Sequence, residues 1–392
     1  MILLPVYWHI ILSIIQIFSH GLVIVLLFQL YNKIGISIYS SFLLSLIIGF
    51  NPNLLYYSTY ILSDQIFGVI VSLTWISLIA LVFSKSKQKI ISNKYLYITG
   101  IFSGLAIVTK PAWLLGILPI ILTVLLIERN KRILFISISV LLVLHFSFST
   151  YWTLYKNQVN NKPIYGISKE ENVIERLLLY FGGRNINDGA IRLGLINHGI
   201  GTDLYNKIES KGLLNTAKKL NGDNMNNYLI IKDSLNWEDW SDVEFARSIL
   251  TNVPGKYYFN RMKQWYTFFT KRMFHPSIDS AFPKASYILK LGYIKFYNVL
   301  YRPFLLLLLL IFIGMMIIIK NIRYKIILYS SIPIICYYTI LHTLIASWNN
   351  EFIRFRTSIE YILFFCALLP IGIIFDKIID YFHQSYVSKV KK

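Results

Sequence analysis

Charged side chains are scarce in this chain of 392 residues. Only 15% of the residues are Asp, Glu, Lys or Arg, whereas 55% are hydrophobic and the mean hydropathy is +0.55. Ordinary soluble domains carry roughly 25% charged residues, and several apolar runs here exceed the ~18 residues that indicate a membrane span. The composition therefore excludes an ordinary soluble domain and predicts a polytopic membrane protein.

Cysteine is nearly absent, and so are the local motifs of common catalytic sites. Cys336 and Cys366 both lie in apolar runs, so no disulfide framework is indicated. The sequence has no glycine-rich phosphate loop and no nucleophile elbow. Histidines in the apolar runs lack the spacing of metal ligands to one another, so no metal site is predicted. These histidines are His9, His20, His145 and His342.

Acidic residues are outnumbered by basic ones, 19 against 39, which gives a formal net charge of +20. In a soluble protein this excess would indicate a nucleic-acid partner. Here the basic residues cluster in short connections between alternate apolar runs and in the C-terminal tail, as the positive-inside rule expects of cytoplasmic segments. The charge is therefore mostly a signal of topology, and no nucleic-acid partner is predicted. The clusters are at 85–94, 129–132, 320–325 and 377–392.

The apolar runs predict an all-α bundle of membrane-spanning helices. The expected spans are 5–31, 36–50, 65–83, 95–109, 112–127, 133–151, 299–319, 326–346 and 357–375. Placing the basic clusters in the cytoplasm puts the turns at 51–64, 110–111 and 347–356 outside. The expected protein is thus a multi-pass protein of the cell (inner) membrane, with an extracytoplasmic loop and a cytoplasmic C-terminus.

The long outer segment, residues 152–298, differs in composition from its flanks. Most of the acidic residues of the chain fall in it, and its stretch NGDNMNNYLIIKDSLNWEDWSDVEFARSIL is polar. We predict a mostly helical extracytoplasmic domain, and the alternative is a plain loop domain without its own active site. The chain then divides into N-terminal helices (1–151), this domain, C-terminal helices (299–375) and a basic cytoplasmic tail (376–392).

Four stretches occur in an order that resembles a known family. They are LLPVYWHIILSIIQIFSHG (3–21), NPNLLYYSTYILSDQIF (51–67), GIFSGLAIVTKPAWLLGILP (100–119) and FIRFRTSIEYILFFCALL (352–369). Their order resembles the GT-C superfamily of membrane glycosyltransferases, and within it the bacterial relatives of dolichyl-phosphate-mannose protein mannosyltransferases, which include aminoarabinose transferases. The resemblance implies a GT-C-like bundle that moves a sugar from a polyprenyl-phosphate carrier to a lipid, glycan or protein acceptor at the outer face.

Three basic residues are the candidate contacts of the donor phosphate. Arg354 and Arg356 stand in the late motif, and the planar fork of arginine suits phosphate; the alternative is that they snorkel towards the headgroups. Lys110 precedes Pro111 where the family commonly has arginine, which implies a phosphate contact there too. The alternative for Lys110 is an interfacial lysine that caps a turn between two short spans.

The candidate acids are fewer. Asp64 is the candidate catalytic residue, and the resemblance suggests that it orients a substrate or binds a divalent cation. The local pattern favours a helix N-cap made by Ser63 and Asp64, and both roles can hold together. Glu351 and Glu360 are expected to support the arginines, and pairing with an arginine is the favoured role of Glu360. No other cofactor is expected.

The chain departs from the family pattern in two places. In the family, a first helix and an outer loop with the catalytic acid precede the Pro-x-Tyr segment, which is residues 5–7 here. The charge pattern independently requires an upstream helix, because it leaves the N-terminus outside. We therefore expect that the chain as written does not catalyse unless Asp64 replaces the absent acid. Thr357, Ser358 and Ile359 stand where the family usually has prolines after the arginines.

Two other function classes fit parts of the pattern. An O-antigen or polysaccharide polymerase or ligase also uses outer-face arginines and a large outer loop. A non-enzymatic polysaccharide carrier or flippase would more often show inverted repeats and polar residues at mid-span, and the sequence shows neither. A glycosyltransferase with a lipid-linked donor is the favoured prediction.

Overall fold

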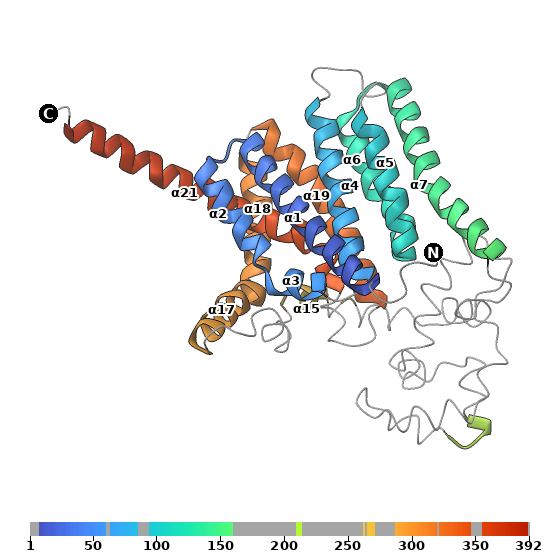
Figure 1. Ribbon diagram of the computed structural model, residues 1–392. Coiled ribbons are helices and arrows are strands. Elements are labelled where there is room, and N and C mark those ends of the chain that lie inside the picture. The colour runs from blue at the N-terminus through green and yellow to red at the C-terminus, as the bar shows by residue number, and fades with distance from the viewer. Residues whose placement is uncertain are drawn as a thin grey trace. The chain divides into compact units, whose positions relative to one another are not determined.

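The described part of the chain is entirely helical in its regular structure. The computed structural model describes residues 8–59, 63–84, 94–159, 209–213, 262, 265–270, 287–319, 321–345 and 355–390. Within these ranges no strand occurs, and five helices are long and apolar enough to cross a membrane, judged by length and composition. The five are α1 (Trp8–Ile34), α4 (Ser63–Ser84), α7 (Lys131–Val159), α19 (Ile322–Ile345) and α21 (Glu360–Val390) (Figure 1). A multi-pass helical membrane protein is therefore the architecture that the structure supports.

Several of the predicted spans are shorter helices. They are α2 (Ile38–Gly49), α5 (Lys94–Thr109), α6 (Ile117–Ile127) and α18 (Leu305–Ile318). The break between α5 and α6 lies at Lys110, whose backbone is extended with φ −146° and ψ 117°. Extended geometry is favoured there because the ring of Pro111 disfavours a helical conformation in the residue before it. A 3-10 turn, η2 (Pro111–Gly116), then leads into α6.

The chain forms two compact units. The first comprises Met1–Phe148, Phe268–Tyr338 and Ile353–Lys392, and the second comprises Ser149–Thr267 and Thr339–Phe352. In the second unit, the indole of Trp265 at the start of α15 (Trp265–Thr270) donates a hydrogen bond of 2.9 Å to the hydroxyl of Thr339. Most of the predicted outer domain lies outside the described residues, and the candidate site lies wholly in the first unit.

The first unit also holds α17 (Tyr287–Val299), which the sequence analysis places in the outer domain. Two tyrosines explain this position. The hydroxyls of Tyr293 and Tyr297 donate to the carbonyls of Phe50 and Ile47 at the end of α2, where helical carbonyls lack partners within their own helix. Burial raises the pKa of both tyrosines well above its usual value, so they remain neutral donors. A π turn, η5 (Leu300–Phe304), joins α17 to α18.

The first half of α21 is the centre of the first unit. Its residues from Glu360 to Leu369 are buried on all sides, and it packs against α2, α4 and α18. The ring of Tyr31 stacks on that of Phe365 with centroids 4.1 Å apart, and the Tyr31 hydroxyl donates to the Phe365 carbonyl at 3.0 Å. A helix that is apolar all round is buried in a protein core or faces lipid, and neighbouring helices bury this segment.

The turn between α1 and α2 depends on one glycine. Gly35 adopts φ +104°, which L-residues with a side chain rarely adopt, and the backbone N–H of Ile36 then returns to the carbonyl of Tyr31 at 3.1 Å. The N-terminus of α2 is capped in part by its own Ser37, whose hydroxyl accepts from the N–H of Ser40 at 3.3 Å. Asp376 of α21 accepts from both the N–H and the hydroxyl of Ser37.

Helices α5 and α7 approach closely at two glycines spaced as Gly-x-x-x-Gly, Gly100 and Gly104. A Cβ atom added at Gly104 would lie 2.8 Å from the backbone oxygen of Leu144, and one added at Gly100 would lie 2.8 Å from the Leu144 side chain. Small residues at this spacing allow helix backbones to come together in a membrane.

Replacing Gly104 with alanine is expected to lower the free energy of unfolding by about 1–3 kcal/mol, the usual cost of overpacking a tight contact. The backbone of α7 cannot move aside as a flexible side chain can. The matched control is Gly21→Ala in α1, because a Cβ there meets nothing within 4 Å. Thermal unfolding of the purified protein in detergent measures both, and equal midpoints for the two variants would contradict the close approach.

Candidate functional site

An ion pair between Asp64 and Lys110 links the start of α4 to the break after α5. The ammonium of Lys110 donates to Oδ1 of Asp64, which is completely buried, while Lys110 is 6% exposed. Asp64 lies in the first turn of α4, where an acid interacts favourably with the helix dipole. The ammonium also lies 5.3 Å from the ring centre of Phe67 and 5.5 Å from that of Phe355. A carboxylate and two aromatic rings therefore hold this cation.

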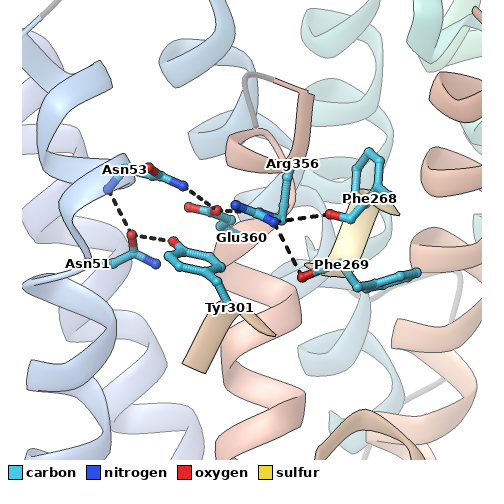
Figure 2. Close-up of polar contacts among 7 residues, drawn as sticks. All are labelled: Asn51, Asn53, Phe268, Phe269, Tyr301, Arg356 and Glu360. Carbon is cyan, nitrogen blue, oxygen red and sulfur yellow. Dashed lines mark hydrogen bonds and ion pairs between the residues drawn. The ribbon is translucent and has the colours of Figure 1, made fainter. Parts of the chain in front are cut away.

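A second buried ion pair joins Arg356 to Glu360 at the start of α21. Nε of Arg356 donates to Oε1 of Glu360 at 2.9 Å, and both side chains are fully buried. Nη1 of Arg356 donates to the carbonyls of Phe268 and Phe269 at 3.1 and 3.4 Å (Figure 2). The guanidinium carbon lies 4.2 Å from the ring centre of Tyr301. Arg356 thus connects α21, α15 and the π turn before α18.

Two asparagines position the carboxylate of Glu360. Asn53 donates from Nδ2 to Oε1 of Glu360 at 3.0 Å, and the backbone N–H of Asn53 donates to Oδ1 of Asn51 at 2.9 Å. Asn51 accepts at the same oxygen from the hydroxyl of Tyr301 at 2.7 Å (Figure 2). Asn51 is therefore the N-cap of α3 (Pro52–Thr59), with Pro52 at the first helical position.

A third polar cluster lies next to both ion pairs along the chain. The hydroxyl of Tyr361 donates to Nδ1 of His20 and accepts from Nε2 of Gln65, each at 2.7 Å. We assign the His20 proton to Nε2 because that nitrogen faces the carbonyl of Gly49 at 3.0 Å, which only accepts. Gln65 follows Asp64 and Tyr361 follows Glu360, so this cluster holds the starts of α4 and α21 in register.

Helix α4 approaches the segment before α21 closely at Gly68. A Cβ atom added at Gly68 would lie 3.2 Å from the backbone of Ser358 and 3.3 Å from the carbonyl of Thr357. The close contact places the second turn of α4 directly beside the chain that carries Arg356.

The structure decides between several of the alternatives that the sequence left open. Glu360 pairs with Arg356, as the sequence analysis favours. Arg356 is fully buried, so snorkelling towards headgroups is wrong for this residue. At the N-terminus of η2 the Lys110 side chain makes no cap hydrogen bond, and its ammonium contacts Asp64. Arg354 and Glu351 lie outside the described residues, and their predicted roles stay predictions.

Sequence reasoning missed the polar residues that surround these pairs. Asn51 and Asn53 flank Pro52 between two apolar runs, and this Asn-Pro-Asn pattern is an N-cap signal that could have indicated a site. His20 and Gln65 are uncharged polar residues in expected spans. Like charged residues there, they indicate a candidate functional site. Tyr301 carries no such signal, because tyrosine is common in the chain and at membrane interfaces.

Chemically, the arrangement offers a carboxylate and an ammonium in contact, enclosed by apolar and aromatic side chains. Among the residues described above, no group of three or more His, Cys, Asp or Glu side chains is placed to hold a metal ion. No family model, no curated protein and no solved structure matches this chain. The candidate site is therefore identified from the residues of this chain alone.

Proposed function

We propose that this chain is a membrane glycosyltransferase that moves a sugar from a polyprenyl-phosphate carrier to an acceptor hydroxyl at the outer face. The reaction needs a carboxylate that accepts or orients the acceptor proton, and a cation that stabilises charge on the departing phosphate. The observation that carries the proposal is the contact between Asp64 and Lys110, which brings one group of each kind together although they are 46 positions apart.

The roles divide between the two ion pairs. Lys110 is the less completely buried of the two cations, 6% exposed against 0% for Arg356, so we assign it the phosphate, and Asp64 is then released to act as the base. Arg356 is fully buried and already donates to Glu360 and to the carbonyls of Phe268 and Phe269. We therefore assign Arg356 the positioning of α15 and α21, and leave direct donor contact in the late motif to Arg354.

The test uses the full chain in lipid nanodiscs with a polyprenyl-phosphate donor labelled in its sugar. We expect release of polyprenyl phosphate and transfer of label to an acceptor. Lys110→Met is expected to abolish release, because no cation remains to stabilise the leaving phosphate. The control is Lys295→Met, which removes an exposed lysine from α17.

The products separate this function from its competitors. Label that crosses the membrane with its carrier intact would indicate a carrier or flippase, and a lengthened glycan on the carrier would indicate a polymerase. Donor that remains intact with every acceptor fraction tested would overturn the proposal.

A further inference from the structure

The second half of α21 extends past the helices that enclose its first half. Asp376 is held at the turn between α1 and α2 by Ser37, whose backbone N–H donates to the carboxylate at 2.7 Å. Lys33, in the last turn of α1, marks the same basic end of the bundle. The helix continues to Val390 beyond this turn, and Figure 1 shows it projecting past α2 towards the C-terminus.

This second half has two chemically distinct faces. Apolar side chains exposed on it are Ile374, Phe375, Ile378, Ile379, Tyr381 and Phe382. At 100° per residue they fall within an arc of ~160°. Asp376, Lys377 and Asp380 occupy the opposite arc, and Asp376 turns that arc towards α2. Phe382 is 67% exposed, so the apolar face is a surface that the described residues of this chain do not cover.

By length and composition the part of the helix from Glu360 to Phe382 could cross a membrane by itself, but the whole helix is longer than a membrane span requires. The helix has 31 residues, or ~46 Å at 1.5 Å per residue, whereas a bilayer has a hydrocarbon core of ~30 Å. Its first half lies inside the protein, and Asp376 and Lys377 follow where the other helices turn. An amphipathic helix at this place, parallel to the surface, would bury its apolar face at the boundary between headgroups and acyl chains.

The charge after the turn fits an anionic surface. Residues 377–392 carry one acid, Asp380, and four lysines: Lys377, Lys389, Lys391 and Lys392. Basic residues beside a span are attracted to acidic headgroups. We propose that residues 377–390 form an interfacial helix that binds anionic lipid at the basic end of the bundle, with the Phe382 face in the bilayer and the Asp380 face in water.

The test places one nitroxide label on each face of the full chain in nanodiscs that contain anionic lipid. Phe382→Cys and Asp380→Cys are made after Cys336 and Cys366 have been replaced by serine. Collision rates with oxygen, which concentrates in the bilayer, and with a water-soluble nickel chelate report the depth of each label. We expect the ratio of oxygen to nickel collisions to be several-fold higher at 382 than at 380. Replacing Lys389, Lys391 and Lys392 with glutamine, or the anionic lipid with a zwitterionic one, should reduce that difference.

Each other result overturns the proposal in its own way. A high ratio at both positions would make the segment part of a transmembrane span, and a low ratio at both would place it in water. A label at 382 that is shielded from both reagents only at high protein-to-lipid ratio would assign the face to a second copy of the chain. If the difference in collision ratio between positions 382 and 380 is the same in zwitterionic lipid, the helix does not bind anionic lipid specifically and that part of the proposal is wrong.

Discussion

Replacing Arg356 with leucine is expected to lower the free energy of unfolding by about 3–5 kcal/mol, because breaking a buried ion pair leaves an uncompensated charge. The carboxylate of Glu360 would remain fully buried with the amide of Asn53 as a donor. The carbonyls of Phe268 and Phe269 would lose the donor that Nη1 supplies. This loss is a large part of the stability of a typical protein.

The double variant Arg356→Leu/Glu360→Leu distinguishes the loss of stability caused by an unpaired charge from the loss caused by poorer packing. It removes both charges, so we expect it to be more stable than Arg356→Leu alone, since apolar replacement of a whole buried pair is often neutral. Thermal unfolding in detergent, monitored by retention of the monomer peak on gel filtration, measures all variants. Lys295→Leu on α17 is the control at an exposed site. If Arg356→Leu unfolds at the same temperature as this control, the pair does not hold the bundle together.

Under the proposed glycosyltransferase function, replacing Asp64 with asparagine is expected to reduce sugar transfer by ~10²–10⁴-fold, the usual effect of losing a positioned general base. Asparagine preserves the shape of the side chain but cannot accept a proton from a hydroxyl. The variant also leaves Lys110 without its anionic partner, so a loss of activity by itself does not separate chemistry from folding.

The exchanged pair Asp64→Lys/Lys110→Asp makes that separation. It keeps one acid and one ammonium in contact, so its thermal midpoint is expected to be closer to that of the original chain than the midpoint of Asp64→Asn. Transfer should still be lost, because the base and the phosphate contact have changed places. Transfer at the original rate by the exchanged variant would show that the pair is structural only.

The positions of the helices could be read from the sequence. The run predicted at 65–83 is α4, the run at 95–109 is α5, and the break at Lys110 is where the structure has it. The helices can be predicted because a backbone in lipid must satisfy its own hydrogen bonds, and a helix does so between residues that are close in sequence. Proline and glycine then mark the breaks, because their effects on the backbone act over one or two residues.

The sequence also identified which ionisable residues to examine, because a charge beside an apolar run is costly wherever it lies. The residues that they contact could mostly not be predicted from the sequence. Only Arg356 and Glu360 stand close together in the chain, four residues apart, so pairing of Glu360 with a nearby arginine could be expected from the sequence.

The other contacts of the site were decided by tertiary structure alone. Asp64 meets Lys110 across 46 positions, Tyr301 meets Asn51 across 250, and Asn53 meets Glu360 across 307. Helical periodicity determines which residues share a face, but the packing of the bundle determines which faces meet. Gly68 is one example, since its missing side chain allows α4 to approach the backbone of Ser358 closely. The local sequence pattern therefore determines where the helices and their charged residues lie along the chain, and the packing of the helices determines which of those residues contact one another.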